Sequence, residues 1–415
     1  MNTPERLPVA EFDDNLPARH RAGRFWQLAF LASTVIAVLV LSVLLLNIID
    51  GVAGYVALEA KVAPATLAVD GVALKDLPAS ELIRILQENL SSGALNKLNN
   101  EQPFAERSQA NLYDLVVARV VRYDVVASWS LWESLSHSAA IQAEAAAGYP
   151  QAELHFISWL TLDTIRRPQS SEAVNAGVRT AILGSLWTIA ITILVAFPLG
   201  VGAAIYLEEY AVDNSINRLI RTNINNLAGV PSIIYGILGL AVFVRAMEAL
   251  TSGAFLGVVD PTTANGRTIL SAGLTLALLV LPLIIINAQE AIRAVPQSLR
   301  KASLGIGATK WQTIWSHVLP NALPGILTGT ILAVSRAIGE TAPLVVIGAS
   351  TAISFDPTSP FSKFTTLPIQ IYQWTSRPQA EWRHLAAAAI LILLILLLSL
   401  NASAIVLRNR FTKRF

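Results

Sequence analysis

The chain has 415 residues, of which 53% are hydrophobic and only 14% charged, and its formal net charge at pH 7 is +2. This apolar excess, with a mean hydropathy of +0.54, is more than the core of a soluble domain requires, and it predicts an integral membrane protein. The chain has no cysteine, which excludes thiolate catalysis, disulfide bonds and cysteine-based zinc sites.

Six apolar stretches are long enough to cross a bilayer, whose hydrocarbon core of about 30 Å requires about 20 helical residues. They cover residues 25–49, 180–207, 222–244, 268–289, about 318–350 and 385–407. Only the fifth is interrupted by charges, at Arg336 and Glu340. The first follows Arg19, Arg21 and Arg24, as in a signal peptide, but its length and the lack of a convincing cleavage site predict an uncleaved anchor.

The distribution of Lys and Arg predicts the orientation of these stretches. If the N-terminal tail, residues 1–24, is cytoplasmic, the internal segments carry Arg6, Arg19, Arg21, Arg24, Arg218, Arg221, Arg293, Arg300, Lys301, Lys310, Arg408, Arg410, Lys413 and Arg414. The short external loops then carry only Arg245, Arg267, Lys363, Arg377 and Arg383. We therefore expect both termini, the second being the tail 408–415, in the cytoplasm.

The long connection 50–176 would then be an external insert between the first two spans. Its composition is mixed, with helix-like ASELIRILQENL from Ala79 and strand-like YDLVVARVVRYDVV from Tyr113, and it is long enough to bury a small core. His137 and His155 lack nearby metal-ligand spacing, so we expect surface or packing roles for them. Docking and covering a neighbouring subunit are both open as its function.

A polar excursion, residues 289–326, separates the fourth and fifth spans on the cytoplasmic side. Pro296 interrupts any helix that runs on from the fourth span, and Gly305 and Gly307 permit a bend between two short helices. In the second helix, Trp311 and Trp315 combine with Ile314 to give one apolar face. Such a helix either lies on the membrane surface or enters a groove on a cytoplasmic partner.

This excursion resembles the EAA loop of the membrane subunits of binding-protein-dependent ABC importers. In that loop a small-residue triplet is followed by a glycine and, after a helix, by Leu-Pro, and matching positions here are Ala302, Ser303, Gly307, Leu319 and Pro320. Lys301 stands where the family has glutamate, and His317 stands where an aliphatic residue is commoner.

Three further segments resemble the PstA-type permease subunit of the phosphate-specific importer: IYLEEYA from Ile205, NNLAGVPSIIYGILGL from Asn225 and SRAIGETAPLVVIGA from Ser335. The likeness covers residues 177–407. It implies an all-α fold of six transmembrane helices in the bacterial cytoplasmic (inner) membrane, in which 177–407 is the importer transmembrane domain and about 290–318 is its coupling loop.

The resemblance also implies the partners. They are a second, PstC-type permease, a dimer of a PstB-type ATPase, a periplasmic PstS-type phosphate-binding protein and membrane lipid, without nucleic acid. ATP and Mg would belong to the ATPase, so this chain would be neither an enzyme nor a cofactor carrier; its LGIGATKW segment lacks the spacing of a phosphate-binding loop. The implied ATPase contacts are Ala302, Ser303, Leu304, Gly307, Ala308, Thr309 and Trp311.

Arg336 and Glu340 are the informative charges. Because an arginine at the centre of a span costs at least about 2.5 kcal/mol, it should face protein or a water-filled cavity. One interpretation is a salt pair that locks a single helix. The other, which we favour because membrane charges usually mark a substrate path, is that Arg336 offers forked donors to an oxyanion, while Glu340 orients the fork or accepts a hydrogen bond from a protonated phosphate oxygen.

The backbone near this pair suggests a broken helix. Gly339 and Pro343 bracket it, and Thr341 adds a hydroxyl to the candidate pathway; packing alone is an equally weighted explanation for the proline. In AGVPSIIYG, residues 228–236, close helix packing is the stronger interpretation and pore lining by Ser232 the weaker one. We expect the charges of EEY, residues 208–210, to be solvated.

Together these features predict a permease subunit that moves inorganic phosphate inward when ATP-driven closure of its partners moves the spans. A related oxyanion such as phosphonate is the nearest alternative substrate. A secondary anion transporter should show inverted repeats and would not need the excursion after residue 289. A membrane enzyme should place a base or metal cluster beside Glu340, and none is apparent in its motif.

Overall fold

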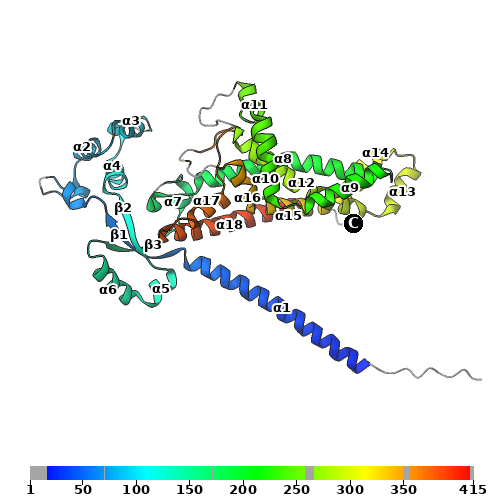
Figure 1. The fold of residues 1–415 in the computed structure, drawn as a ribbon, viewed down its shortest axis with the longest axis horizontal. Coiled ribbons are helices and arrows are strands. Elements are labelled where there is room, and N and C mark those ends of the chain that lie inside the picture. The colour runs from blue at the N-terminus through cyan, green and yellow to red at the C-terminus, as the bar shows by residue number, and fades with distance from the viewer. Residues whose placement is uncertain are drawn as a thin grey trace, which may run out of the picture.

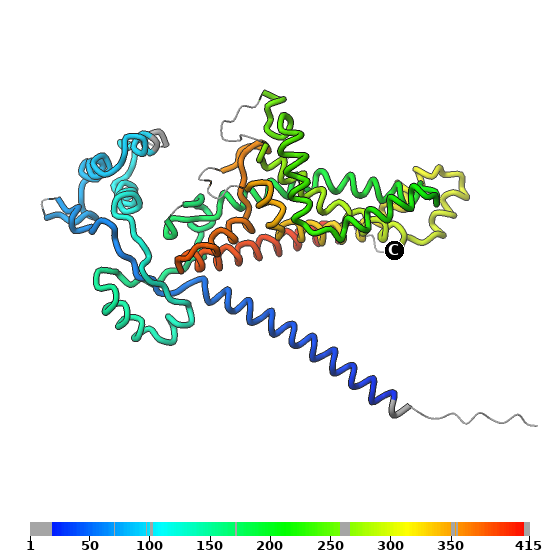
Figure 2. Tube along the Cα trace, viewed as in Figure 1, coloured from blue at the N-terminus to red at the C-terminus, as the bar shows by residue number. Residues whose placement is uncertain are grey.

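The computed structural model describes residues 16–69, 71–101, 103–170, 172–257, 266–349, 353 and 356–411. A bundle of long helices carries at one end a smaller body that contains one sheet, and α1, Leu16–Asp50, leaves the bundle as a single long helix (Figure 1). The end of α18, Ala380–Phe411, lies at the same end of the bundle as α13 and α14 (Figure 2). Residues 1–15 and 412–415 of the predicted tails lie outside the described residues.

Five helices in the described part of the chain are long and apolar enough to cross a membrane. They are Arg19–Asp50, Arg179–Tyr210, Ile269–Arg293, Lys310–Gly339 and Ala380–Arg410. A bent pair, Ser215–Ala228 and Ser232–Ala246, adds a sixth if it forms one span. The predicted all-α membrane fold is therefore confirmed.

The third predicted span is not one straight helix. Helix α9, Ser215–Ala228, and α10, Ser232–Gly239, meet at 105°. Pro231 causes the corner, because its ring disfavours a helical conformation at the residue before it and it lacks an N–H. The Tyr235 hydroxyl then donates to the Leu227 carbonyl at 2.8 Å and fixes the corner. The span predicted over 222–244 therefore contains a sharp corner, which its apolar composition did not indicate.

Helix α12, Ile269–Arg293, lies at the centre of the bundle. It begins at Thr268, whose side chain accepts from the Ser271 N–H, and its buried residues recur every three or four positions. These residues are Ile269, Ala272, Leu276, Val280 and Ile284. They face α8, Arg179–Ile205, and α15, Leu319–Gly339, so α12 connects the helix that enters the bundle from the insert with the helix that carries Arg336.

The insert is a mixed α/β body. Its sheet has the order β2-β1-β3 with antiparallel pairs, formed by β1, Ala53–Ala60, β2, Tyr123–Ser128, and β3, Glu153–Ser158. The helices are α2, Ala79–Asn89, α3, Ser92–Glu101, α4, Gln109–Val116, α5, Leu131–Ser136, α6, Ser138–Gly148, and α7, Leu162–Arg166. His137 and His155 are exposed.

The strand predicted from Tyr113 is only half correct. The chain there continues α4 into a π-helical turn, Val117–Val121, and only residues after Arg122 form β2. The physical reason is helical spacing: Leu112, Val116 and Val120 fall four residues apart and are all buried in the core beside α2. Arg122, with φ of 47°, makes the turn into the strand.

The insert is packed against the bundle at the start of α18. Val56 and Leu58 of the central strand share a core with Trp374 and Trp382. His384 of α18 lies 2.7 Å from the Gly51 carbonyl and 3.1 Å from the Ser128 hydroxyl, so one imidazole joins the end of α1, the sheet and α18.

Candidate functional site

Arg336 and Glu340 form an ion pair at the end of α15. Arg336 Nε lies 3.4 Å from Glu340 Oε1, and the side chains are 49% and 18% exposed respectively. Glu340 caps the helix with an extended backbone, and its N–H donates to the Ala337 carbonyl. The long contact engages one guanidinium nitrogen, which leaves much of the fork accessible from outside this chain.

The helix breaks immediately after this pair. Thr341 follows Glu340, and α16, Ala342–Ile347, begins with Pro343 in its first turn and ends at Gly348. Thr341 is half-buried, and its carbonyl accepts from the Val345 N–H at 3.0 Å. Arg336, Glu340 and Thr341 therefore occupy the last turn of one helix and the break before the next.

Pro343 also has a packing role. It is buried against Gly236 of α10, where an added Cβ would lie 2.6 Å from the Pro343 Cα. Ser232, at the start of α10, is half-buried, and no contact among the described residues joins it to Arg336. Within 228–236, Gly236 thus serves close helix packing, which agrees with the interpretation favoured from the sequence at that position.

The predicted coupling loop, about residues 290–318, contains two short helices joined by a tight bend. Helix α13, Gln297–Gly305, starts after Pro296, and α14, Lys310–Thr313, starts at a capping box of Thr309 and Gln312. The chain turns at Gly307, with φ of 90°. A π-helical turn, Ile314–Val318, then leads directly into α15.

The surface of this segment differs from the predicted amphipathic face. Trp311 and Trp315 stack at 5.5 Å between centroids and are 54% and 63% exposed, whereas Ile314 is 1% exposed and faces the bundle. The three residues therefore do not share one face. The exposed aromatic pair is an outward surface, and the aliphatic residue anchors the segment to the bundle.

The seven predicted coupling residues divide in the same way. Ala302, Leu304, Gly307, Thr309 and Trp311 are exposed, Ala308 is half-buried, and Ser303 is buried with its hydroxyl 2.9 Å from that of Thr313. Ser303 therefore joins α13 to α14. Sequence reasoning missed Ile306, which is 86% exposed; an aliphatic residue between two glycines of a polar loop was the available signal.

The EEY segment was also misjudged. Glu208 and Glu209 are not solvated: their side chains are 16% and 9% exposed, and both are paired with arginines. A carboxylate removed from water requires such partners. The arginines lie far along the chain, at Arg221, Arg293 and Arg300, so local sequence carried no sign of the pairing.

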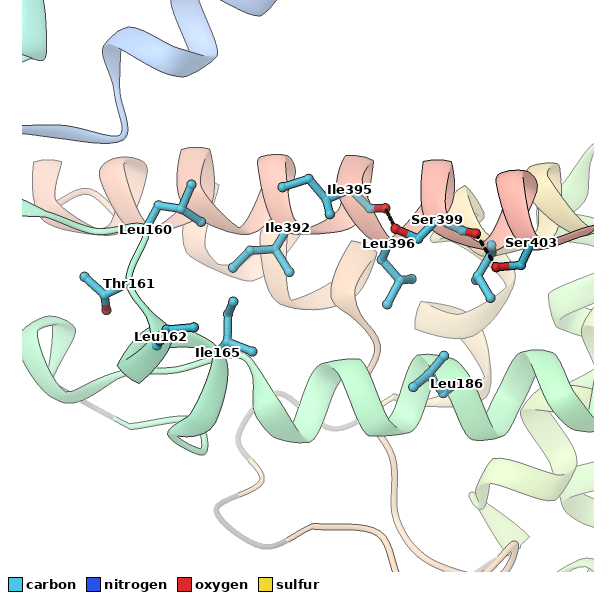
Figure 3. A pocket seen from close by; sticks show the side chains of 11 residues that line it. Leu160, Thr161, Leu162, Ile165, Leu186, Ile392, Ile395, Leu396, Ser399 and Ser403 are labelled. Carbon is cyan, nitrogen blue, oxygen red and sulfur yellow. Dashed lines mark hydrogen bonds between the residues drawn. The ribbon is translucent and has the colours of Figure 1, made fainter. Parts of the chain in front are cut away.

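Two cavities away from Arg336 lack the character of an anion site. A groove of about 550 Å³ between α7, α8 and α18 is lined by apolar residues and by Thr161, Ser399 and Ser403 (Figure 3). The two serine hydroxyls donate to carbonyls of their own helix, and the Thr161 hydroxyl lies 3.0 Å from that of Thr164. A polar cavity of about 460 Å³ lies beside the insert. Its basic residues Lys61 and Arg122 are already paired, with Asp124 at 3.1 Å and Glu172 at 3.3 Å.

The bundle of apolar helices, its broken span and the exposed loop of α13 and α14 define a multi-pass membrane permease. Residues 196–415 match the family described as binding-protein-dependent transport system inner membrane component. The chain belongs to this family and is a PstA-type ABC transporter permease. In this family the permease is a non-catalytic subunit of the inner membrane that works with a separate ATPase and a binding protein.

Two relatives are themselves named as transporter permeases. The chain is 34% identical over 249 residues to a phosphate transport system permease protein PstA of Yersinia pestis, covering 60% of this chain and 77% of the relative. It is 33% identical over 219 residues to the probable ABC transporter permease protein YqgI of Bacillus subtilis (strain 168), covering 52% and 68%. The solved bacterial alginate ABC transporter is similar at 16% identity and a TM-score of 0.45, covering 68% of this chain and 92% of that one.

Proposed function

We propose that this chain forms, with a second permease subunit, the pathway by which inorganic phosphate enters the cytoplasm at the expense of ATP. The observation that carries the proposal is the half-exposed guanidinium of Arg336 at the broken end of a membrane span. Relatives that share 33–34% identity are named phosphate transport permeases, which supports the choice of substrate.

The exposure of Arg336 supports a pathway at a subunit interface. A charge facing lipid at the centre of a bilayer costs at least about 2.5 kcal/mol, so an exposed arginine at the broken end of a span is more stable against water or another subunit. Glu340, which is 18% exposed, holds Nε and leaves the remaining donors for a tetrahedral oxyanion. In this proposal the salt pair with Glu340 orients the guanidinium that binds phosphate.

The partner types belong to the same proposal. PstC-type, PstB-type and PstS-type subunits would supply the second half of the pathway, the ATPase and phosphate delivery. The exposed Ile306, Trp311 and Trp315 form the surface offered to the ATPase. The ATPase would bind ATP and Mg, and this chain would transmit the movement.

The orientation is proposed from charge. Arginines and lysines concentrate at the end of the bundle that holds α13 and α14, so this end and both termini are assigned to the cytoplasm and the insert to the outside. Because the chain has no cysteine, a thiol reagent can react only with the one cysteine that each variant introduces into it. A membrane-impermeant thiol reagent added to intact cells should label Trp132→Cys in the insert and spare Arg410→Cys; the opposite labelling would reverse the assignment.

The function is tested by phosphate uptake into vesicles that contain the assembled transporter. Uptake should require both the second permease and ATP, and phosphonate should compete weakly or not at all. Uptake by this chain alone would instead identify a secondary transporter, and stronger uptake of phosphonate than of phosphate would change the substrate.

A further inference from the structure

Three consecutive residues at the end of α8 each contact different helices at the end of the bundle that carries α13 and α14. Glu208, Glu209 and Tyr210 close a π-helical turn, Tyr206–Tyr210, that continues α8. Successive residues of a helix point about 100° apart, so three neighbours face three directions. Short π-helical turns occur frequently at functional sites.

Glu208 joins the ends of α8 and α12 to the middle of α9. Arg293, the last residue of α12, donates from Nε to Oε1 at 3.0 Å and from Nη2 to Oε2 at 3.1 Å. Arg221 of α9 donates from Nη1 to Oε2 at 3.4 Å and also reaches the Leu207 carbonyl. The carboxylate is therefore enclosed by two guanidinium groups, and the bidentate pair with Arg293 fixes the end of α8 against that of α12.

Glu209 holds the first coupling helix. Its Oε1 accepts from Arg300 Nε at 3.0 Å and from Arg300 Nη2 at 2.8 Å, and the two side chains are 9% and 15% exposed. Arg300 also donates to the Ile292 carbonyl at 2.8 Å. Since Ser303 is the one buried residue of α13, this arginine is a principal tie between that helix and the bundle.

Tyr210 contacts the second coupling helix. The Lys310 ammonium, at the start of α14, lies 5.0 Å from the centre of the Tyr210 ring, within range of a cation–π interaction. Glu208 therefore contacts α12 and α9, Glu209 contacts α13, and Tyr210 contacts α14.

The far end of α8 is tied to the opposite side of the bundle. Arg179 Nε lies 2.8 Å from Asp356 Oδ2, and the Thr180 hydroxyl donates to Asp356 Oδ1 at 2.9 Å. Asp356 lies in the segment that follows α16, the short helix after the Arg336 break. One helix thus spans the distance from the coupling loop to the segment beyond the candidate pathway.

We propose that Glu208, Glu209 and Tyr210 form a clamp that transmits displacement of the coupling loop to α8. The inference rests on the proposed function, in which an ATPase displaces α13 and α14. When α13 moves, the buried Arg300–Glu209 pair carries α8 with it, and the Asp356 contacts extend that movement to the other end of the bundle. These are positioning residues, since they touch neither substrate nor nucleotide.

The test compares Glu209→Gln with a charge exchange, Glu209→Arg combined with Arg300→Glu, in the assembled transporter. Glu209→Gln keeps a side-chain oxygen that can accept from Arg300, so the transporter should still assemble, in reduced amounts because the charge of Arg300 loses its partner. Per assembled complex it should lose about tenfold in phosphate uptake and keep most of its ATP hydrolysis, so that less phosphate enters per ATP. The charge exchange should recover a large part of the uptake. Asp213→Asn is the matched control. Asp213 follows Tyr210 by three residues, and it forms an exposed pair with Arg218 in which Nε and Oδ1 are 3.4 Å apart.

Two outcomes overturn the clamp. Normal uptake per ATP in Glu209→Gln removes the transmission role. A parallel loss of assembly, uptake and ATP hydrolysis that the charge exchange does not repair assigns the pair to folding alone.

A distance measurement keeps the clamp testable if phosphate proves not to be the substrate. Spin labels at Leu199→Cys on α8 and Ser298→Cys on α13, both exposed positions outside the implied ATPase contacts, report whether the helices move together. Their separation should stay constant between nucleotide-free and ATP-bound complexes, and it should change on ATP binding when Glu209→Gln is added. Identical behaviour with and without that substitution contradicts the clamp whatever the substrate is.

Discussion

At the scale of single residues, backbone conformation and charge pairing matter more than residue type. Glu208 and Glu340 are both carboxylates at helix ends, yet one is enclosed by two arginines and the other holds one nitrogen of a half-exposed guanidinium. Removing one partner of an enclosed pair is strongly destabilising, by about 3–5 kcal/mol, because the other charge stays buried. Arg336 is half-exposed and meets Glu340 through one nitrogen at 3.4 Å, so this burial penalty does not apply to it.

Gly307 supplies the sharpest residue-scale prediction. Its φ of 90° is costly for any side chain, and nothing lies within 4 Å of an added Cβ, so Gly307→Ala introduces backbone strain of about 1–2 kcal/mol without a clash. Because the strain falls on the bend between the coupling helices, ATP-driven uptake should fall while the chain still inserts, as vesicle uptake and immunoblotting would measure.

The matched control is Gly71→Ala in the insert, which has φ of 78° and equally open surroundings. Similar strain there should leave uptake intact. Equal losses in both variants, or normal uptake per ATP in Gly307→Ala, would remove the bend from the coupling mechanism.

At the scale of elements, the sequence predicted where the spans lie but not where one of them bends. Residues 180–207 and 268–289 lie within the long helices Arg179–Tyr210 and Ile269–Arg293, because continuous apolar composition determines a span. The stretch 222–244 has the same composition, but Pro231 and the Tyr235 bond to Leu227 turn it through 105°. The break after Gly339 was foreseen from Pro343, whereas the arginine partners of 208–210 depend on contacts 13 to 91 residues apart.

The contact between α10 and α16 gives an element-scale prediction. In Gly236→Ala, the added methyl group meets the Pro343 backbone at 2.6 Å, which cannot yield as a flexible side chain would. Overpacking of this kind costs about 1–3 kcal/mol, so the thermal unfolding temperature of the purified protein in detergent should fall.

Gly202→Ala is the control on α8, where nothing lies within 4 Å of the added Cβ. Its unfolding temperature should stay the same or rise slightly, since alanine favours a helix over glycine. An unchanged temperature in Gly236→Ala would show that α16 moves aside easily, and the break beside Arg336 would then not be rigidly supported.

At the scale of the whole molecule, the single chain is incomplete as a transporter. Helix α1 exposes nearly all of its apolar side chains, the surface around Trp311 and Trp315 is open, and half of the Arg336 side chain is uncovered. The insert, by contrast, has its own core and is joined to the bundle through His384. Lipid or partner subunits therefore cover the apolar surfaces of the membrane helices, while the insert packs against the bundle of its own chain.

The central claim is that Arg336 binds phosphate on its way through the membrane. It is tested most directly by measuring ATP-driven phosphate uptake, with ATP hydrolysis in the same vesicles, for Arg336→Ala and for Arg84→Ala, an equally exposed arginine in the insert at 51%. Arg336→Ala should abolish uptake while the ATPase remains bound and active, and Arg84→Ala should transport normally. Uptake at the normal rate in Arg336→Ala would contradict the account.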